Sequence, residues 1–300
     1  MTVTAFFLIL LSVLLHAGWH FLAKSRNPVP ALFLLVSGSA FLATLIPALY
    51  AGVDYGALPA RFYIYVFCGG ASGALCSTGL SIAYRHSGVS FAYPLARAVP
   101  VLLTALVTVV FGIGLRPSAA ALGGMGLIFL GCLLMPLKKF SGFRLSNYLN
   151  PALSGVLLAA LGTTGYTIFD SEGIRLVNEY GHTGRIAGAV AYSNLRELVL
   201  FSLLSLSILV RKRNRADFNR ELFRHWEPYA GGVAAAAAYI LVMLAMGEVT
   251  NVSFVQAFRQ MSLPVGVLLG VLILKERITR PELTGLILLL AGLVTVALGR

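Results

Sequence analysis

Ten apolar runs, each about 20 residues long, occupy most of the sequence. A helix of about 20 residues spans the hydrocarbon core of a bilayer, so runs of this length predict transmembrane helices. The composition agrees, because 58% of the residues are hydrophobic and only 11% are charged, whereas soluble domains carry about 25% charged residues. The predicted helices cover 2–22, 30–50, 62–84, 89–111, 119–137, 152–169, 185–210, 229–247, 252–274 and 283–298. We therefore expect an all-α polytopic membrane protein.

The first apolar run has to be distinguished from a cleaved signal peptide, because TAFFLILLSVLLHA ends in a small residue. No basic residue precedes it, and its apolar character continues to Ala23. We therefore expect this run to be retained as the first transmembrane helix.

Basic residues concentrate on one side of the predicted helices. The formal net charge of +12 does not indicate a nucleic-acid partner, because the basic residues lie between the apolar runs and follow the positive-inside rule. The loops after odd-numbered helices carry Lys24, Arg26, Arg85, Lys138, Lys139, Arg144, six residues between 211 and 224, Lys275, Arg277 and Arg280. The other side carries only Arg61, Arg116, Arg175, Arg185 and Arg300. This count predicts both termini outside, with the 211–224 loop in contact with anionic lipid headgroups.

One sequence pattern occurs twice, as SFAYPLARAVP from Ser90 and as SFVQAFRQMSLP from Ser253. The alignment pairs Tyr93 with Gln256, Arg97 with Gln260 and, after one inserted residue, Pro100 with Pro264. Five predicted helices per half is an odd number, so consecutive copies insert with opposite orientations. Inverted repeats of this kind are a recurring architecture of secondary transporters. We expect two inverted five-helix repeats, 1–137 and 151–300, joined by a basic linker at 138–150.

Few charged residues lie deep inside the predicted helices, and these are Arg97, Arg196, Glu197 and Arg259. An arginine at a helix centre costs about 2.5–3.5 kcal/mol on insertion scales, so it should face a cavity or a partner. The predicted substrate-binding residues are Tyr93, Arg97, Arg196, Gln256, Arg259 and Gln260. The alternative is that each arginine snorkels to the interface or pairs with Glu197 for structural reasons.

Four further residues are candidates for coupling or gating. Glu197 is the only acidic residue that the predicted spans place deep in the bilayer, which makes it the candidate for proton coupling, with structural pairing to an arginine as the alternative. Pro100 and Pro264 free backbone carbonyls and can kink their helices. His16 lies mid-span, where it either faces a wet cavity or packs against a neighbouring helix.

Catalytic motifs are missing from the sequence, which contains no HExxH, no GxSxG with a suitable histidine, no Gly-rich phosphate loop and no CxxC. Cys68, Cys76 and Cys132 lie inside apolar runs, and their spacing indicates neither disulfides nor a metal site. We expect them to pack as small hydrophobic residues. The sequence predicts no enzyme, no cofactor and no metal.

A family resemblance rests on three stretches: His16-Ala17-Gly18-Trp19, 90–100, and Pro264 through LKERIT to Gly285 and Gly292. On these residues the chain resembles the EamA family of the drug/metabolite transporter superfamily. In the first half, Gly112 stands where the alignment with Glu276 calls for an acid, so a role for that carboxylate does not extend to this half. The resemblance implies ten helices as inverted repeats and transport of small metabolites. Well-known members have both termini inside, which conflicts with the loop charges, and here we follow the loop charges.

More narrowly, the AYPLAR stretch from Ala92 to Arg97, with Pro100 beyond it, is similar to a subgroup of permeases associated with phosphonate utilisation. The surplus of intramembrane arginine suits an anion. We expect a secondary transporter, permease or exporter, that moves a small polar or anionic metabolite by alternating access. It would lie among the lipids of a bacterial inner membrane, as a monomer or homodimer. The alternative is a non-transporting membrane subunit or lipid-flippase partner, with a closed midplane and paired arginines.

Overall fold

The computed structural model describes residues 2–24, 30–87, 89–142, 148–210, 223–275 and 277–299. Glu276 and the side chain of Trp19, which carry part of the family resemblance, lie outside this description. The described chain is helical, with no β-strand among its elements. The longer helices are α1 (Val3–Lys24), α2 (Pro30–Leu49), α3 (Ala60–His86), α4 (Val89–Phe111), α5 (Ala119–Leu134), α7 (Ala152–Tyr180), α8 (Arg185–Val210), α11 (Glu227–Met246), α12 (Val252–Phe258), α13 (Ser262–Leu274) and α14 (Arg280–Leu298). Short 3-10 turns, η1 (Phe140–Gly142) and η2 (Arg259–Met261), complete the fold.

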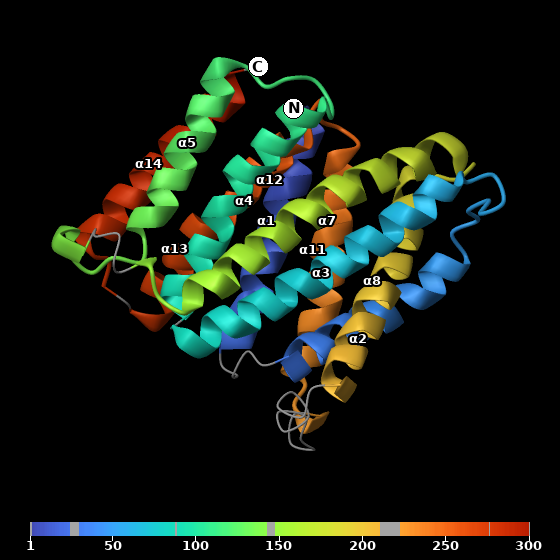
Figure 1. The fold of residues 1–300 in the computed structure, drawn as a ribbon, viewed down its shortest axis with the longest axis horizontal. Helices are drawn as coiled ribbons and strands as arrows, with labels where there is room; N and C mark the ends of the chain where they lie inside the picture. The colour runs from blue at the N-terminus through green and yellow to red at the C-terminus, as the bar shows by residue number, and fades with distance from the viewer. Residues whose placement is uncertain are drawn as a thin grey trace.

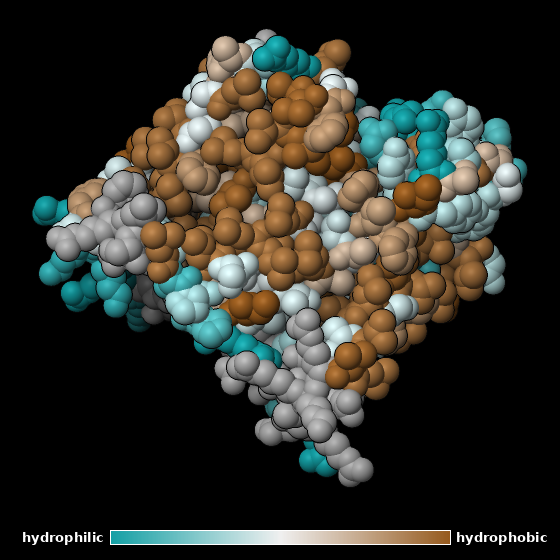
Figure 2. All heavy atoms as spheres, in the orientation of Figure 1, coloured by the Kyte–Doolittle hydropathy of each residue, from teal (hydrophilic) through white to brown (hydrophobic). Residues whose placement is uncertain are grey.

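The molecule is an integral, multi-pass membrane protein by the length and composition of its helices. Eight helical segments among the described residues are long and apolar enough to cross a bilayer, where the sequence predicts ten. The shorter apolar helices are α5 and Val3–His16, the part of α1 whose side chains are described. Figure 2 shows apolar side chains over much of the visible surface. Leu42, Leu106 and Leu272 are each more than half exposed, which suits contact with lipid and would be unusual over so wide an area of a soluble monomer.

Two predicted helices differ from the structure. α7 continues to Tyr180, well beyond the predicted end at 169. Its polar extension remains helical because Arg175 forms ion pairs with Glu172 and Glu179 on the exposed side, at the i,i+3 and i,i+4 spacings that support a helix. On the opposite side, Ile174 and Val177 are buried. The second difference is that the predicted helix 252–274 is interrupted by η2.

Helices from the two halves of the chain pack against each other, and Figure 1 shows the overall arrangement. The contacts between helices before residue 143 and helices after residue 150 include α1 on α11, α2 on α8, α3 on α7, α4 on α7 and α12, and α5 on α14. The α5–α14 contact is made by glycines, with Gly124 against Gly292 and Gly131 against Gly285. This order of contacts means that α5 and α14 run in opposite directions. Glycines of this kind let helix backbones approach closely in a membrane.

The α3–α7 contact uses the same device. Gly79 and Gly155 face each other, and a Cβ atom at either one would meet the backbone of the other helix. The α2–α8 contact adds polar links, because Asn194 donates from Nδ2 to the Phe41 carbonyl at 2.9 Å and to the Thr44 hydroxyl at 3.0 Å. These contacts hold the helices that surround the centre of the molecule.

The interruption at η2 has a local cause. Pro264 has no N–H to donate to the carbonyl of Gln260, so the helix lacks one backbone hydrogen bond there. The backbone tightens into a 3-10 turn over Arg259–Met261 before α13 begins. α4 contains Pro94 and Pro100 yet remains a single helix. The two prolines that the sequence pairs therefore have different effects on the backbone.

Candidate functional site

A cavity of about 180 Å³ lies between the helices near the centre of the molecule. Its walls come from α1, α2, α3, α4, α7, α8, α11 and η2. The wall is apolar at Phe33 and Leu80, which lie near the start of α2 and the end of α3, and polar at the middle of the bundle. The polar lining residues are His16, Ser37, Cys76, Ser77, Tyr93, Arg97, Thr163, Tyr166, Arg196, Glu197, Tyr239 and Arg259. Three arginines therefore face one small cavity.

Arg97 reaches the cavity from α4 and is 7% exposed. Its Nη2 atom donates to the Ser262 hydroxyl at 2.6 Å, and its guanidinium lies 5.3 Å from the centroid of the Tyr93 ring. Its Nε atom is buried and has no hydrogen-bond partner among the residues that the structure describes. A buried guanidinium with an unsatisfied donor is costly unless a ligand or water completes its shell.

Arg259 enters the cavity from the 3-10 turn η2 and is 6% exposed. Its contacts are long: Nη2 lies 3.4 Å from the Tyr166 hydroxyl, and Nη1 lies 3.5 Å from Oε1 of Gln256. Arg97, Arg259 and His16 also share an adjoining hollow of about 10 Å³, so the two arginines face the same small region of the site.

Arg196 is held quite differently, by two carboxylates. Its Nε lies 3.0 Å from Oδ2 of Asp170, and its Nη1 donates to Oε1 of Glu197 at 2.5 Å. Asp170 also accepts the Tyr239 hydroxyl at 2.5 Å and the Tyr192 hydroxyl at 3.0 Å. Asp170 is 0% exposed, whereas Glu197 lines the cavity.

The charges of the site are therefore unevenly distributed. Both carboxylates lie on Arg196, and none lies within ion-pair distance of Arg97 or Arg259 in the described part of the chain. A pair of tyrosines separates the two regions: the guanidinium groups of Arg196 and Arg259 lie 4.6 to 5.7 Å from the ring centroids of Tyr166 and Tyr239. The region of Arg97 and Arg259 can accept an anion by charge-assisted hydrogen bonds.

The structure brings together six of the residues predicted from the sequence, and these are His16, Tyr93, Arg97, Arg196, Glu197 and Arg259. Gln256 and Gln260 were expected to line the cavity but do not. Both are fully buried behind it, where Gln260 donates to the backbone carbonyl of Gln256 at 3.1 Å. The 3-10 turn changes the register of the chain here, so Arg259 occupies the wall in place of Gln260. Pro100 and Pro264 lie outside the lining as well.

The sequence reasoning missed Asp170, Tyr166 and Tyr239. The expectation that Glu197 is the only acidic residue deep in a span is wrong, because Asp170 lies inside α7 and is the more deeply buried of the two. Arg196 and Glu197 also bond each other, and neither is paired with Arg97 or Arg259. The spacing of Tyr166, Asp170, Ile174 and Val177, three or four residues apart, was the available signal that α7 continues.

Hydrogen bonds join the two halves of the chain on the side of the molecule where α1 begins and α14 ends. The N–H of Asp54 donates to the carbonyl of Gly181 at 3.0 Å, and the N–H of Leu115 donates to the carbonyl of Thr250 at 2.8 Å. Asn251 adds bonds from Nδ2 to the carbonyls of Ile113 and Leu115 at 3.0 and 3.1 Å. We call the side that holds these bonds the terminal face. The cavity extends away from it, toward Phe33 and Leu80.

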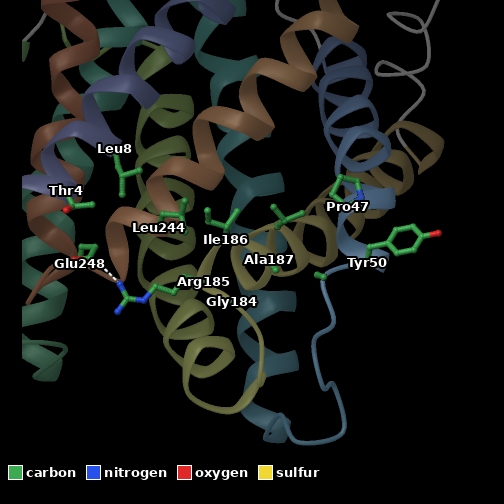
Figure 3. Close-up of a pocket in the computed structure, with 12 residues that line it drawn as sticks. Thr4, Leu8, Pro47, Tyr50, Gly184, Arg185, Ile186, Ala187, Leu244 and Glu248 are labelled. Atoms are coloured by element: carbon green, nitrogen blue, oxygen red, sulfur yellow. Dashed lines mark hydrogen bonds and ion pairs between the residues drawn. The ribbon is translucent and has the colours of Figure 1, made fainter.

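A larger hollow of about 810 Å³ lies elsewhere, between α1, α2, α8 and α11. Figure 3 shows its wall of Leu8, Ile186, Ala187 and Leu244, with Arg185 reaching Glu248 at its edge. This wall offers few hydrogen bonds to a polar solute. The central cavity, with its three arginines, is therefore the candidate site.

No protein-family model matches the sequence, and no curated protein matches it. Among solved structures, 27 chains match. One, described only as "Crystal structure of protein", covers 99% of this chain and 97% of its own, with a TM-score of 0.70 and 15% sequence identity. At that identity the likeness shows the fold alone. The fold and site define the class as a multi-pass α-helical membrane protein with an arginine-lined central cavity.

Proposed function

We propose that this protein is a secondary transporter that moves a small polar or anionic metabolite across the membrane by alternating access. The observation that carries the proposal is the pair Arg97 and Arg259, buried in a central cavity with no carboxylate beside them among the described residues. Two uncompensated guanidinium groups would be expensive to keep in a membrane protein without a function. An anionic substrate supplies the missing charge.

The helix packing supports an architecture of two inverted five-helix repeats, with α1 and α5 counted as spans. In that scheme the first helix of each half packs on the third helix of the other, as α1 on α11 and α7 on α3. The second and fifth helices pack on their own counterparts, and the fourth helix, α4, touches its counterpart α12 as well as α7. A twofold relation between the halves explains this pattern, and the opposite directions of α5 and α14 agree with it. We infer repeats over 1–137 and 151–300, joined by a linker at 138–150, as in the EamA family.

Alternating access requires that the cavity open to one side at a time. The hydrogen bonds of the terminal face, from Asp54 to Gly181 and from Leu115 to Thr250, join the two inferred repeats and close that side. The described residues of the predicted basic loops, among them Arg85, Lys138 and Lys275, lie on the opposite side. By the positive-inside rule we place those loops in the cytoplasm and both termini outside, in a bacterial inner membrane. The structure then corresponds to a state closed to the outside.

We assign roles within the site as follows. Arg97 and Arg259 bind the anionic group, and Tyr93 and Tyr166 position their guanidinium groups through the contacts described above. Glu197 is the coupling residue, because it is the acid that lines the cavity. The break at η2 beside Pro264 gives the second repeat a hinge at the site, since interrupted helices are common at transporter binding sites. We propose no enzymatic activity.

Transport by purified protein in liposomes tests the function. The panel contains acetate, succinate, aspartate, inorganic phosphate, methylphosphonate and 2-aminoethylphosphonate, each with and without a pH gradient. We expect saturable flux of at least one anion, absent from protein-free liposomes. If correctly inserted protein moves none of them under either condition, the transporter assignment fails and a non-transporting membrane subunit becomes the better account.

A further inference from the structure

A carboxylate, that of Glu197, lies in the cavity wall together with the arginines. Arg196 carries one positive charge and meets two carboxylates, Asp170 and Glu197. With both carboxylates ionised, this cluster holds one more negative charge than positive charge. An ionised carboxylate in the binding cavity weakens the binding of a simple anion, because like charges repel within a low-dielectric site.

The two carboxylates of this cluster are not equivalent. Asp170 is fully buried and accepts hydrogen bonds from the Tyr192 and Tyr239 hydroxyls in addition to its ion pair with Arg196. Both of its carboxylate oxygens therefore have partners. Glu197 has one bond, from Arg196 to Oε1, and no bond to Oε2 is present among the described residues. Glu197 lines the cavity, whereas Asp170 does not. The surplus negative charge of the cluster is therefore presented to the cavity at Glu197.

The cavity thus has a positive end at Arg97 and Arg259 and a negative end at Glu197. The two ends are close, because Arg196 and Arg259 contact the same pair of rings, Tyr166 and Tyr239. The cavity volume of about 180 Å³ also limits the ligand to a small molecule. A ligand that satisfies both ends carries an acid and a cation separated by a few bonds.

We propose that the cavity binds a small zwitterion, with its acidic group on Arg97 and Arg259 and a primary ammonium group on Glu197. This inference rests on the proposed transport function and narrows its substrate class. The arginines and carboxylates of the site sum to one positive charge. A ligand with two negative charges and one ammonium group therefore balances the site best. An acidic amino acid and an aminoalkylphosphonate both have this chemistry.

Equilibrium binding to purified, detergent-solubilised protein tests the inference with two matched pairs. Aspartate and succinate differ by the ammonium group, and 2-aminoethylphosphonate and ethylphosphonate differ in the same way. At least one aminated compound should bind about tenfold or more tightly than its partner, because hydrogen bonds between charged groups contribute that much. Equal affinity within both pairs, tighter binding of the compounds without nitrogen, or no binding by any of the four would overturn the proposal.

Glu197→Gln provides the second arm. This change should remove the preference for the aminated compound while leaving the affinity of its partner within about threefold or raising it, because the repulsive carboxylate is gone. Arg97→Gln should weaken both members of the pair. A preference that survives Glu197→Gln excludes Glu197 as the ammonium site. The wild-type comparison stands by itself if the variant does not fold. Binding and flux are separate measurements. Flux of succinate with no preference for binding aspartate would contradict only the proposal that the ligand is a zwitterion. The predicted binding preference without flux would contradict only the proposal that the protein is a transporter.

Discussion

The Nε atom of Arg196 lies 3.0 Å from Oδ2 of Asp170, and the two side chains are 5% and 0% exposed. Asp170→Asn weakens the bonds from Arg196, Tyr192 and Tyr239 but leaves Arg196 with Glu197 as its counterion, so we expect a loss of stability of about 1–3 kcal/mol, the cost of leaving buried polar groups unsatisfied. The melting temperature of the purified protein measures this loss.

A matched control lies on the same helix. Glu172 pairs with Arg175 at 3.0 Å, but the Arg175 side chain is half exposed, and such a pair contributes about 0–1 kcal/mol. Glu172→Gln should therefore melt close to the wild type. If Asp170→Asn melts no lower than Glu172→Gln, the buried cluster does not have the structural importance argued above.

Much of this fold follows from the sequence, since long apolar runs give nearly every helix to within a few residues. Asp170 shows where that reasoning stops. A hydropathy pattern ends a span where polar residues begin, but the chain after Phe169 remains helical because one face is buried in the protein. On the exposed face, Arg175 pairs with Glu172 and Glu179. The hydropathy pattern therefore placed Asp170 outside the predicted helix 152–169.

The composition of the site shows a similar limit. Mid-span charge correctly singled out Arg97, Arg196, Glu197 and Arg259 as cavity residues, because such groups must avoid lipid. Which arginine each carboxylate joins depends on packing between distant helices, as with Asp170 and Tyr239 at 2.5 Å. No local pattern encodes that contact. The exchange of Gln260 for Arg259 in the wall likewise depends on a backbone break that the sequence alone did not reveal.

Cys76 offers a direct test of access to the cavity. It is a native thiol of the lining, 3.3 Å from the Thr163 hydroxyl. In a Cys68→Ser/Cys132→Ser background, a membrane-impermeant thiol reagent should label Cys76 from the side of the basic loops. The matched control keeps only Cys132, which is fully buried, and should remain unlabelled. Protection of Cys76 from both sides would show that the cavity has no aqueous entrance.

Gly131 tests the α5–α14 contact. A Cβ atom at this position would meet the backbone of Gly285 and Leu289, whereas one at Gly126 on the same helix would meet nothing within 4 Å. Gly131→Ala should therefore lower stability by about 1–3 kcal/mol, the usual cost of overpacking. Gly126→Ala should be neutral or slightly stabilising. Equal melting temperatures for the two variants would mean that the helices do not approach as closely as described.

Asn251 tests the closure of the terminal face. Its side chain caps α12 by accepting the Ser253 N–H at 2.9 Å and also bonds the carbonyls of Ile113 and Leu115. Asn251→Ala removes all of these bonds, so we expect the terminal face to open more often and Cys76 to be labelled from that side. Asn150→Ala removes a cap at the other face, where Asn150 accepts the Ala152 N–H, and should not have this effect. Unchanged labelling in Asn251→Ala would contradict the assigned closure.

The central claim is that Arg97 and Arg259 bind the anionic group of a transported solute. Its most direct test is the flux of the best anion of the liposome panel through Arg97→Gln and Arg259→Gln, with Arg175→Gln as an exposed control on α7. We predict that each cavity variant raises KM or lowers flux by about 10- to 100-fold, as expected for losing a hydrogen bond from a charged donor. The control should match the wild type. Wild-type flux in both cavity variants, correctly inserted, would contradict the account.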